Sequence, residues 1–150
     1  MDAIDKSLLG LLQKDCKQTT KELSFKLNLS VTAVYERIKK MEREGVIQQY
    51  VALLDKEKID KELMVFCQIK LLQHSKEYLQ KFESEVTKLA EVLECFHVSG
   101  EYDYLLKVIV KDMEQFRTFM VTKLTTLQHI GSTQSSFVIN EVKNTTLIPL

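Results

Sequence analysis

The sequence has few of the features that mark membrane, secreted or disordered proteins. Its hydrophobic segments are short and interrupted by charged residues, so none is long enough to cross a membrane. The first residues, "MDAIDKSLLGLLQKD", lack the basic region and the small-residue cleavage site of a signal peptide. Pro149 is the only proline, and no tract rich in Pro, Gly or Ser suggests a flexible linker. We therefore expect an ordinary globular protein of the cytoplasm, with no membrane partner.

The chain also lacks the residue patterns of disulfide, metal and catalytic sites. Its three cysteines, Cys16, Cys67 and Cys95, are odd in number, far apart and in no CxxC pair, which argues against a disulfide framework or a zinc site. No phosphate loop, GxGxxG or HExxH motif occurs. Cys95 and His97 lie two residues apart without a third group to orient them, and this favours core packing over catalysis. We predict no enzyme activity, no metal and no cofactor.

The net charge is zero, which at first argues against a nucleic-acid partner. The charge is unevenly distributed, however, because residues 1–50 hold nine Lys or Arg against seven Asp or Glu. Between Lys17 and Arg43 the count is seven basic against three acidic residues. A local excess of this kind permits phosphate contact, although a solvated helix face is the commoner cause.

Apolar residues at helical spacing predict three helices in the first fifty residues. Asp2, one of the threonines at 19 and 20, and Ser30 are suited to cap the first, second and third helix. Asn28 tolerates the left-handed backbone that ends a helix. Gly10, inside the first helix, should cost about 1 kcal/mol relative to Ala, so we expect a close packing contact there.

The second and third helices are joined by a tight turn, as in a helix-turn-helix. In the third helix Val31, Val34, Ile38 and Met41 are spaced to form one buried stripe. In this motif the start of the second helix of the pair contacts base edges in the major groove of DNA, while other side chains hold phosphates. A plain bundle of three helices is the alternative on this pattern alone. The candidate DNA-binding residues are Thr32, Tyr35 and Glu36 for bases, Lys39, Lys40 and Arg43 for phosphates, and Ser30 and Arg37 beside them.

From Met64 onward, alternation and helical spacing predict the order β-α-β-β-α-β of a ferredoxin-like fold. The segment 46–55, "VIQQYVALLD", is rich in β-forming residues and is expected to be a further strand that leads away from the helices. The chain is thus expected to be an α+β protein. The predicted strands are 64–72, 92–98, 104–110 and 132–142, and the predicted helices are 79–89 and 113–127.

Three segments together closely resemble the Lrp/AsnC (feast/famine) family of transcription regulators: "IDKSLLGLLQKD", "ELSFKLNLSVTAVYERIKKMEREGVI" and "VSGEYDYLLKV". They occur in the family's order and spacing, and the resemblance runs from Met1 to about Lys143. Asn28 replaces the glycine usual in the turn, and Val31 replaces the proline common at the start of the third helix. The resemblance implies a helix-turn-helix DNA-binding domain over 1–46, a β-strand linker over 47–60 and a ferredoxin-like effector-binding and oligomerisation domain over 61–150.

The resemblance also implies a dimer, with association up to an octamer of four dimers, and a small effector, which is an amino acid in similar regulators. The loop "GEYD" and the strand "STQSS" then become the candidate effector site. The Asp103 carboxylate can accept from an ammonium, and loop N–H groups with the polar side chains of the strand can donate to a carboxylate. On the residues alone, an ordinary hairpin turn is the favoured interpretation of this loop. The candidate effector-binding residues are Gly100, Tyr102, Asp103, Tyr104, Thr133, Gln134 and Ser135.

The sequence therefore predicts a regulator of transcription that binds double-stranded DNA sequence-specifically and whose DNA binding or assembly responds to an amino acid. The alternative is an oligomeric small-molecule sensor whose helical domain contacts protein instead of DNA. The two differ in the salt dependence of DNA binding, which only phosphate contacts produce.

Overall fold

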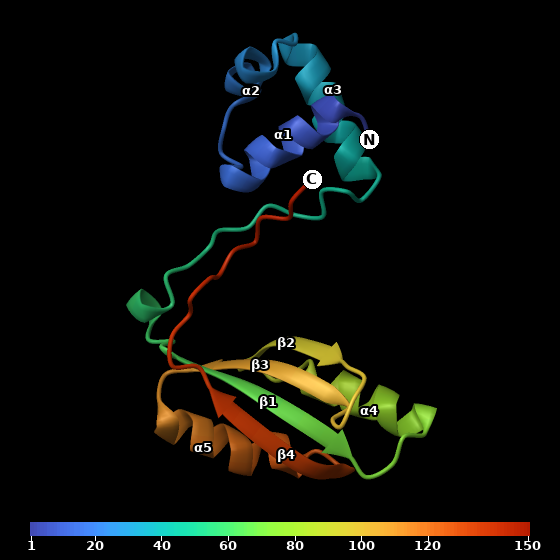
Figure 1. The fold of residues 1–150 in the computed structure, drawn as a ribbon, viewed down its shortest axis with the longest axis vertical. Helices are drawn as coiled ribbons and strands as arrows, with labels where there is room; N and C mark the ends of the chain where they lie inside the picture. Colours follow the sequence, from blue (N-terminus) through green and yellow to red (C-terminus); the bar gives the residue numbers. More distant parts are fainter. The chain divides into compact units, whose positions relative to one another are not determined.

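Each of the first three helices begins at a residue whose side chain caps it. The computed structural model describes residues 1–150, and its first helices are α1 (Ala3–Lys14), α2 (Thr20–Leu27) and α3 (Val31–Arg43) (Figure 1). Asp2 and Thr19 each form a capping box with the residue three positions on. The Ser30 hydroxyl accepts a hydrogen bond from the Ala33 N–H at 3.1 Å. All three helix starts follow the prediction, because a side-chain acceptor satisfies an N–H that has no partner inside the helix.

The helices end as predicted and enclose a small core. α2 stops at Asn28, whose φ of 52° is left-handed, and Gly45 follows α3 with a φ of 71°. The buried core of these helices consists of Leu8, Leu9, Leu12, Leu23, Val34 and Met41. Gly10 is different from our expectation: a Cβ built there would meet no atom within 4 Å, so no close contact requires the glycine.

The rest of the chain forms a four-stranded antiparallel sheet with two helices. The sheet order is β2-β3-β1-β4, and the chain order is β-α-β-β-α-β, which confirms the α+β class and the ferredoxin-like arrangement. The last strand begins two residues earlier than predicted and ends at Phe137, and both helices end earlier than predicted. The elements are β1 (Leu63–Leu71), α4 (Lys76–Val86), β2 (Val92–His97), β3 (Tyr104–Val110), α5 (Met113–Thr122) and β4 (Ile130–Phe137).

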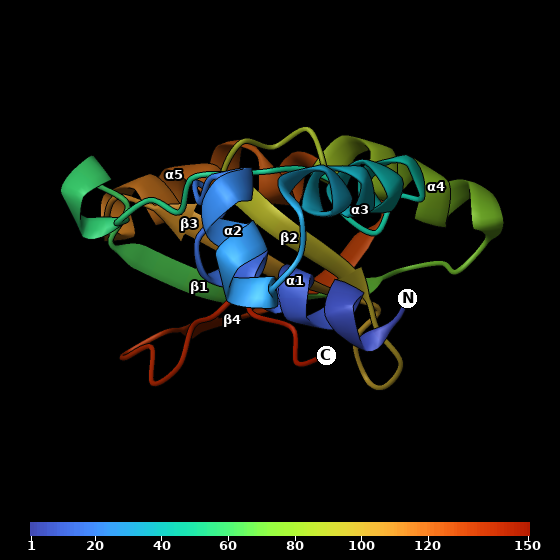
Figure 2. The same ribbon diagram turned by 90° about the horizontal axis from the view of Figure 1, so that it is seen from above.

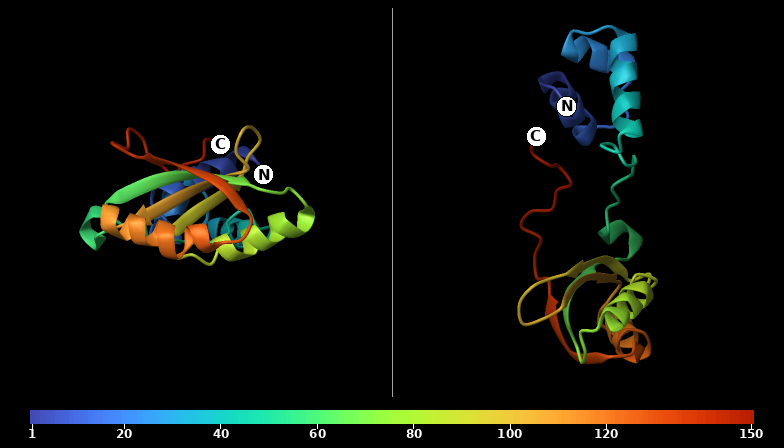
Figure 3. Two further views of the ribbon diagram at one scale, coloured as in Figure 1. Left: turned by 90° about the horizontal axis from the view of Figure 1, so that it is seen from below. Right: turned by 90° about the vertical axis from the view of Figure 1, so that its right-hand side faces the viewer.

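The sheet is covered on one face only. Alternate residues of β1 and β3, such as Val65, Cys67, Leu106 and Val108, are buried against side chains of α4 and α5. Both helices lie on this face of the sheet (Figures 2 and 3). Because side chains alternate along a strand, the residues in between lie on a face that carries no helix. That open face is partly apolar, and Phe96 is 47% exposed on it.

The segment between the helices and the sheet differs from the prediction. Residues 46–55 contain no strand in this single chain, and a short 3₁₀ helix, Glu57–Ile59, follows them. A strand needs a hydrogen-bonded neighbour, and no other segment of the chain pairs with 46–55.

None of the helices is both long and apolar enough to span a membrane.

The chain folds into two compact units. The first comprises residues 1–53 and 142–150, and the second comprises residues 54–141. We predicted that the chain after residue 60 belongs to the second domain, but the last nine residues pack within the first unit. There the Gln13 amide donates to the Ile148 carbonyl at 3.1 Å and accepts from the Ile148 N–H at 2.7 Å. The domain boundaries at residues 46 and 60 stay predictions.

Candidate DNA-binding and effector sites

The outward face of α3 carries most of the predicted DNA-binding side chains. Thr32, Tyr35, Glu36, Lys40 and Arg43 are exposed, since Val34 and Met41 direct the opposite face into the core. Ser30 is exposed as well, with its hydroxyl engaged in the helix cap. The helix thus presents hydroxyl, phenol and carboxylate groups near its start and cations near its end, and groups of these kinds can contact base edges and phosphates.

One member of the predicted buried stripe is on the surface. Val31 is 48% exposed, whereas Val34, one turn further on, is completely buried. The difference has a geometric cause, because helix side chains lean toward the helix N-terminus. At the first position of α3 no preceding turn lies beneath the side chain, and the valine projects beyond the core.

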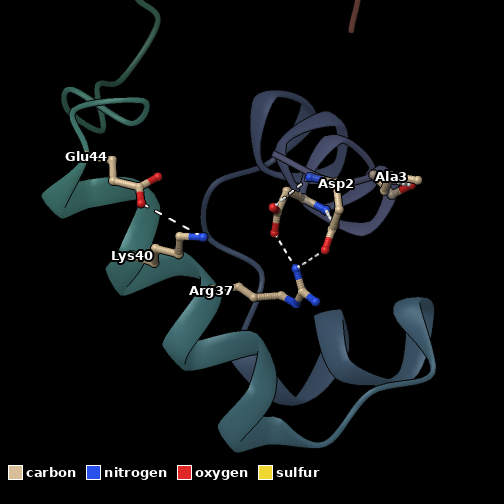
Figure 4. A network of polar contacts seen from close by, with 7 residues as sticks. Asp2, Ala3, Arg37, Lys40 and Glu44 are labelled. Atoms are coloured by element: carbon tan, nitrogen blue, oxygen red, sulfur yellow. Dashed lines mark hydrogen bonds and ion pairs between the residues drawn. The ribbon is translucent and has the colours of Figure 1, made fainter.

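Arg37 is held by α1 instead of facing outward. Its Nη1 lies 2.8 Å from Oδ2 of Asp2 and 2.5 Å from Oδ1 of Asp5 (Figure 4). Each carboxyl accepts the backbone N–H of the other residue and pairs with Arg37, and these contacts hold the pKa of both below the ordinary value of 3.8. The same two carboxylates raise the pKa of the Arg37 guanidinium. Arg37 therefore joins α3 to the cap of α1 and is no longer a good candidate for DNA contact.

The other cations of α3 differ in how they are paired. Lys39 lies 2.7 Å from Glu42, which lowers the pKa of that carboxyl, and its Nζ is 5.8 Å from the centre of the Tyr35 ring. Lys40 lies 3.9 Å from Glu44 (Figure 4). Exposed pairs of this kind contribute little to stability and are easily exchanged for a stronger partner. Arg43 is exposed and makes no ion pair within the chain, so it is the cation most available to a phosphate.

The Asp103 side chain connects the predicted effector loop, residues 100–103, to the end of β1. Its Oδ2 accepts from the Leu71 N–H at 2.7 Å, and its Oδ1 lies 2.8 Å from Nε2 of His74. Its own N–H donates to the Ile69 carbonyl at 2.9 Å. Both carboxylate oxygens are thus already in use. His74 is the partner that the sequence did not indicate, because it lies 29 positions away in a loop with no recognisable motif.

The loop and the last strand meet across β1. The sheet order places β1 between β3 and β4, so the loop and β4 are not direct neighbours. Tyr102 bridges the gap, because its hydroxyl lies 2.6 Å from Oε1 of Gln134. Gly100 is exposed at the tip of the loop with a φ of 136°, a conformation that favours glycine. Tyr102 and Gln134 are therefore the polar side chains that the fold brings together here.

Three predicted effector residues face the covered side of the sheet. Tyr104 is buried between Phe82 and His97, and its hydroxyl donates to Glu83 at 2.8 Å. Burial, together with the Glu83 carboxylate, raises the pKa of this tyrosine. Thr133 and Ser135 alternate with Gln134, and Ser135 lies opposite Cys67, with Oγ 3.7 Å from its Sγ. Tyr104, Thr133 and Ser135 thus lie apart from Tyr102 and Gln134.

Family models match both units. The Lrp/AsnC ligand-binding domain matches residues 64–148, and a winged helix-turn-helix DNA-binding domain matches residues 1–48. The chain belongs to the Lrp/AsnC family of transcription regulators. Its helix-turn-helix is formed by α2 and α3, and no strand that would form a wing follows α3 before β1.

Relatives in the Lrp/AsnC family are similar over nearly their whole length. The DNA-binding transcriptional activator DecR of Escherichia coli K12 is 38% identical over 150 residues, which is all of this chain and 99% of DecR. The leucine-responsive regulatory protein of the same strain is 40% identical over 143 residues, 95% of this chain and 87% of that protein. These similarities show a transcription regulator with a DNA-binding and a ligand-binding domain, as the sequence predicted.

Solved structures agree with this assignment. A transcriptional regulator of Neisseria meningitidis, crystallised as a complex with L-Met, superposes with a TM-score of 0.95 at 36% identity, covering 99% of this chain and 96% of that one. An AsnC family regulator of Agrobacterium tumefaciens superposes with a TM-score of 0.91 at 38% identity, covering 99% and 97%.

Proposed function

We propose that this Lrp/AsnC regulator reads operator DNA with the outward face of α3 and senses a free amino acid with the open face of its sheet. The observation that carries the first part is the exposure of Thr32, Tyr35 and Arg43 along one face of the second helix of a helix-turn-helix. Such a face fits the major groove. The second part is supported by the relative that was crystallised with L-Met.

In the DNA site, we assign base contacts to Thr32, Tyr35 and Glu36 and phosphate contacts to Lys39, Lys40 and Arg43. Arg37 is left out because Asp2 and Asp5 engage its guanidinium. Lys39 and Lys40 can turn from surface carboxylates to phosphates, since exposed ion pairs contribute at most about 1 kcal/mol. A phosphate contact releases condensed counterions and makes the affinity salt-dependent.

In the effector site, we assign ligand contacts to Tyr102, Gln134 and the loop backbone at Gly100. The Gln134 side chain accepts from Tyr102 and keeps its NH₂ group free to donate to a ligand carboxylate. Asp103 stays our candidate acceptor for the ammonium through Oδ1. The contact of that oxygen with His74 is the one a ligand can replace most easily, because the His74 side chain is 59% exposed. The second oxygen then continues to hold Leu71.

We further propose that the functional unit is a dimer, and that effector binding changes how dimers assemble. The open face of the sheet and residues 46–54 both expose apolar side chains, including Val51, Leu53, Leu54 and Phe96. A second copy offers the same surfaces and can also pair with the backbone of 46–54. Two recognition helices would then contact half-sites a helical turn or its multiple apart.

A sensor whose helices contact protein is the alternative, and DNA selection with the full chain separates the two. We expect enrichment of a two-fold symmetric sequence from a random duplex pool, with an affinity that falls steeply with salt. An amino acid at about 100 times its dissociation constant should add about 2.7 kcal/mol to the free energy of unfolding. A protein that enriches no sequence, or binds DNA independently of salt, would support the alternative.

A further inference from the structure

We propose that Val31 is a specificity-determining residue that recognises the 5-methyl group of a thymine in the operator. The inference rests on the proposed function of α3 and adds to it the type of base that the helix start reads. It follows from three properties of the first turn of α3: exposure, chemistry and charge.

Val31 is the aliphatic residue of α3 whose side chain is exposed. Val34 and Met41 are buried in the core, whereas Val31 is 48% exposed and Tyr35 is 49% exposed. Residues four apart lie on the same side of a helix, so Val31 and Tyr35 form one apolar surface, with Thr32 beside it. In a helix-turn-helix this end of the second helix is the part that reaches the base edges.

The chemistry of this surface limits which base feature it can distinguish. A valine side chain neither donates nor accepts a hydrogen bond, so it cannot read the oxygen and nitrogen groups of the bases. Among the base edges in the major groove, only thymine presents a methyl group. The Ser30 hydroxyl accepts from the Ala33 N–H and so helps to hold the start of the helix in place. An apolar contact with a thymine methyl is therefore the specific interaction open to Val31.

The charge around Val31 permits DNA to approach this closely. Among the five α-helices, α3 is the one with no acidic residue in its first turn; the others carry Asp5, Glu22, Glu77 or Glu114 there. The N-terminus of a helix bears a partial positive charge. Without an acidic side chain to neutralise it, this end of α3 attracts the phosphates that flank the groove.

The test replaces single thymines of the selected operator with uracil, which removes only the methyl group. We expect one thymine per half-site whose replacement weakens binding of the wild-type chain about fourfold at constant salt. This is the fold-change that corresponds to about 0.8 kcal/mol for one buried methyl-sized group, at about 1.4 kcal/mol per factor of ten. Replacement in both half-sites should weaken binding roughly fifteenfold.

A variant then connects this methyl group with Val31. Because both protomers of the proposed dimer carry the change, Val31→Ala should weaken binding to the thymine operator by the factor expected for both half-sites. It should also no longer distinguish thymine from uracil at that position. The matched control is Val121→Ala, which changes a valine of α5 that is 63% exposed and should leave the thymine/uracil ratio unchanged. Val31→Ala should fold normally, because alanine is the better helix former; a circular-dichroism melt checks this.

The outcomes separate this inference from the function on which it rests. Equal affinities for thymine and uracil at every position, or an unchanged thymine/uracil ratio in Val31→Ala, overturn the role of Val31 and leave DNA binding intact. If no sequence is enriched from the pool and the affinity does not depend on salt, DNA reading by α3 itself is wrong.

Discussion

Arg37 of α3 is paired with Asp5 of α1, with Nη1 2.5 Å from Oδ1, and the same nitrogen reaches the Asp2 carboxylate at 2.8 Å. Asp2 and Asp5 also form the capping box of α1. One guanidinium thus connects α3, the helix that we propose reads DNA, with the first turn of α1. The pairing holds α3 against α1 through side chains that lie outside the proposed DNA-binding face.

The first prediction compares the two arginines of α3. Arg37→Ala should lower the midpoint of thermal unfolding, because Asp5 is buried and loses its cationic partner. Arg43→Ala should leave the midpoint unchanged, lower DNA affinity and reduce the salt slope by about one unit. Melting curves and DNA titrations at several salt concentrations measure both effects. If the two variants melt alike, the pairing of Arg37 does not stabilise the fold.

The second prediction concerns acid stability. The pKa of Asp2 and of Asp5 is lowered from 3.8 in the folded chain, so both carboxylates favour folding above that value. This contribution should disappear as the pH falls through 3.8 toward the lower pKa of the folded state. In Asp5→Asn, thermal stability should change less between pH 5 and 3 than in the wild type, roughly the window set by the ordinary Asp pKa. If the thermal stability of Asp5→Asn and of the wild type falls equally over this pH range, the prediction is wrong.

The third prediction separates base contacts from phosphate contacts. Thr32→Ala or Tyr35→Ala should relax the sequence preference, with each lost base contact costing about 1–3 kcal/mol. Lys40→Ala should weaken binding to all sequences alike. Affinities for the selected operator and for single-base variants distinguish these patterns. If Thr32→Ala lowers the affinity for all sequences equally, Thr32 contacts a phosphate and not a base.

The fourth prediction addresses the two roles of Asp103. Asp103→Ala should lower the free energy of unfolding by about 1–3 kcal/mol, because the Leu71 N–H loses its acceptor. Asp103→Asn keeps an acceptor for Leu71 and should stay folded while losing the charge that an ammonium requires. Calorimetric titration of Asp103→Asn with amino acids then decides the ligand role. Undiminished affinity in that variant would place the ammonium elsewhere.

The fifth prediction uses the open space around Gly10. Gly10→Ala should raise the free energy of unfolding by about 1 kcal/mol, because the new Cβ meets nothing within 4 Å and alanine favours the helix. Urea unfolding measures the gain, and a loss of stability in Gly10→Ala would contradict the prediction.

The local structure was predictable because single side chains determine it. Ser30 caps α3, and Asn28 adopts the left-handed conformation that ends α2, as their chemistry indicates. Strand alternation could also have shown that Tyr104 belongs with Leu106 in the core, and that Thr133 and Gln134 face opposite sides. The positions of these residues could therefore have been predicted. The candidate effector list was wrong to group residues that follow one another in a strand, because their side chains lie on opposite faces of the sheet.

Other contacts join residues that lie far apart in the sequence, and no local sequence pattern predicts them. Arg37 meets Asp2 over 35 positions, and Asp103 meets His74 over 29. The sequence around Arg37 does not show that its side chain faces α1, and the sequence around His74 does not show that its side chain faces Asp103. The missing strand at 46–55 has a different cause, since its side chains favour a strand but no segment of the chain pairs with its backbone.

The placement of residues 142–150 in the first unit means that the backbone passes between the two units twice. A single proteolytic cut near residue 53 would leave the second unit attached through its other end, because the Gln13 side chain binds the backbone of Ile148. Such a nicked protein should migrate as two fragments under denaturing conditions, and its elution under native conditions measures whether the contacts of residues 142–150 hold the fragments together. Two cuts, one near residue 53 and one near residue 141, would separate the two units without leaving a segment of one attached to the other.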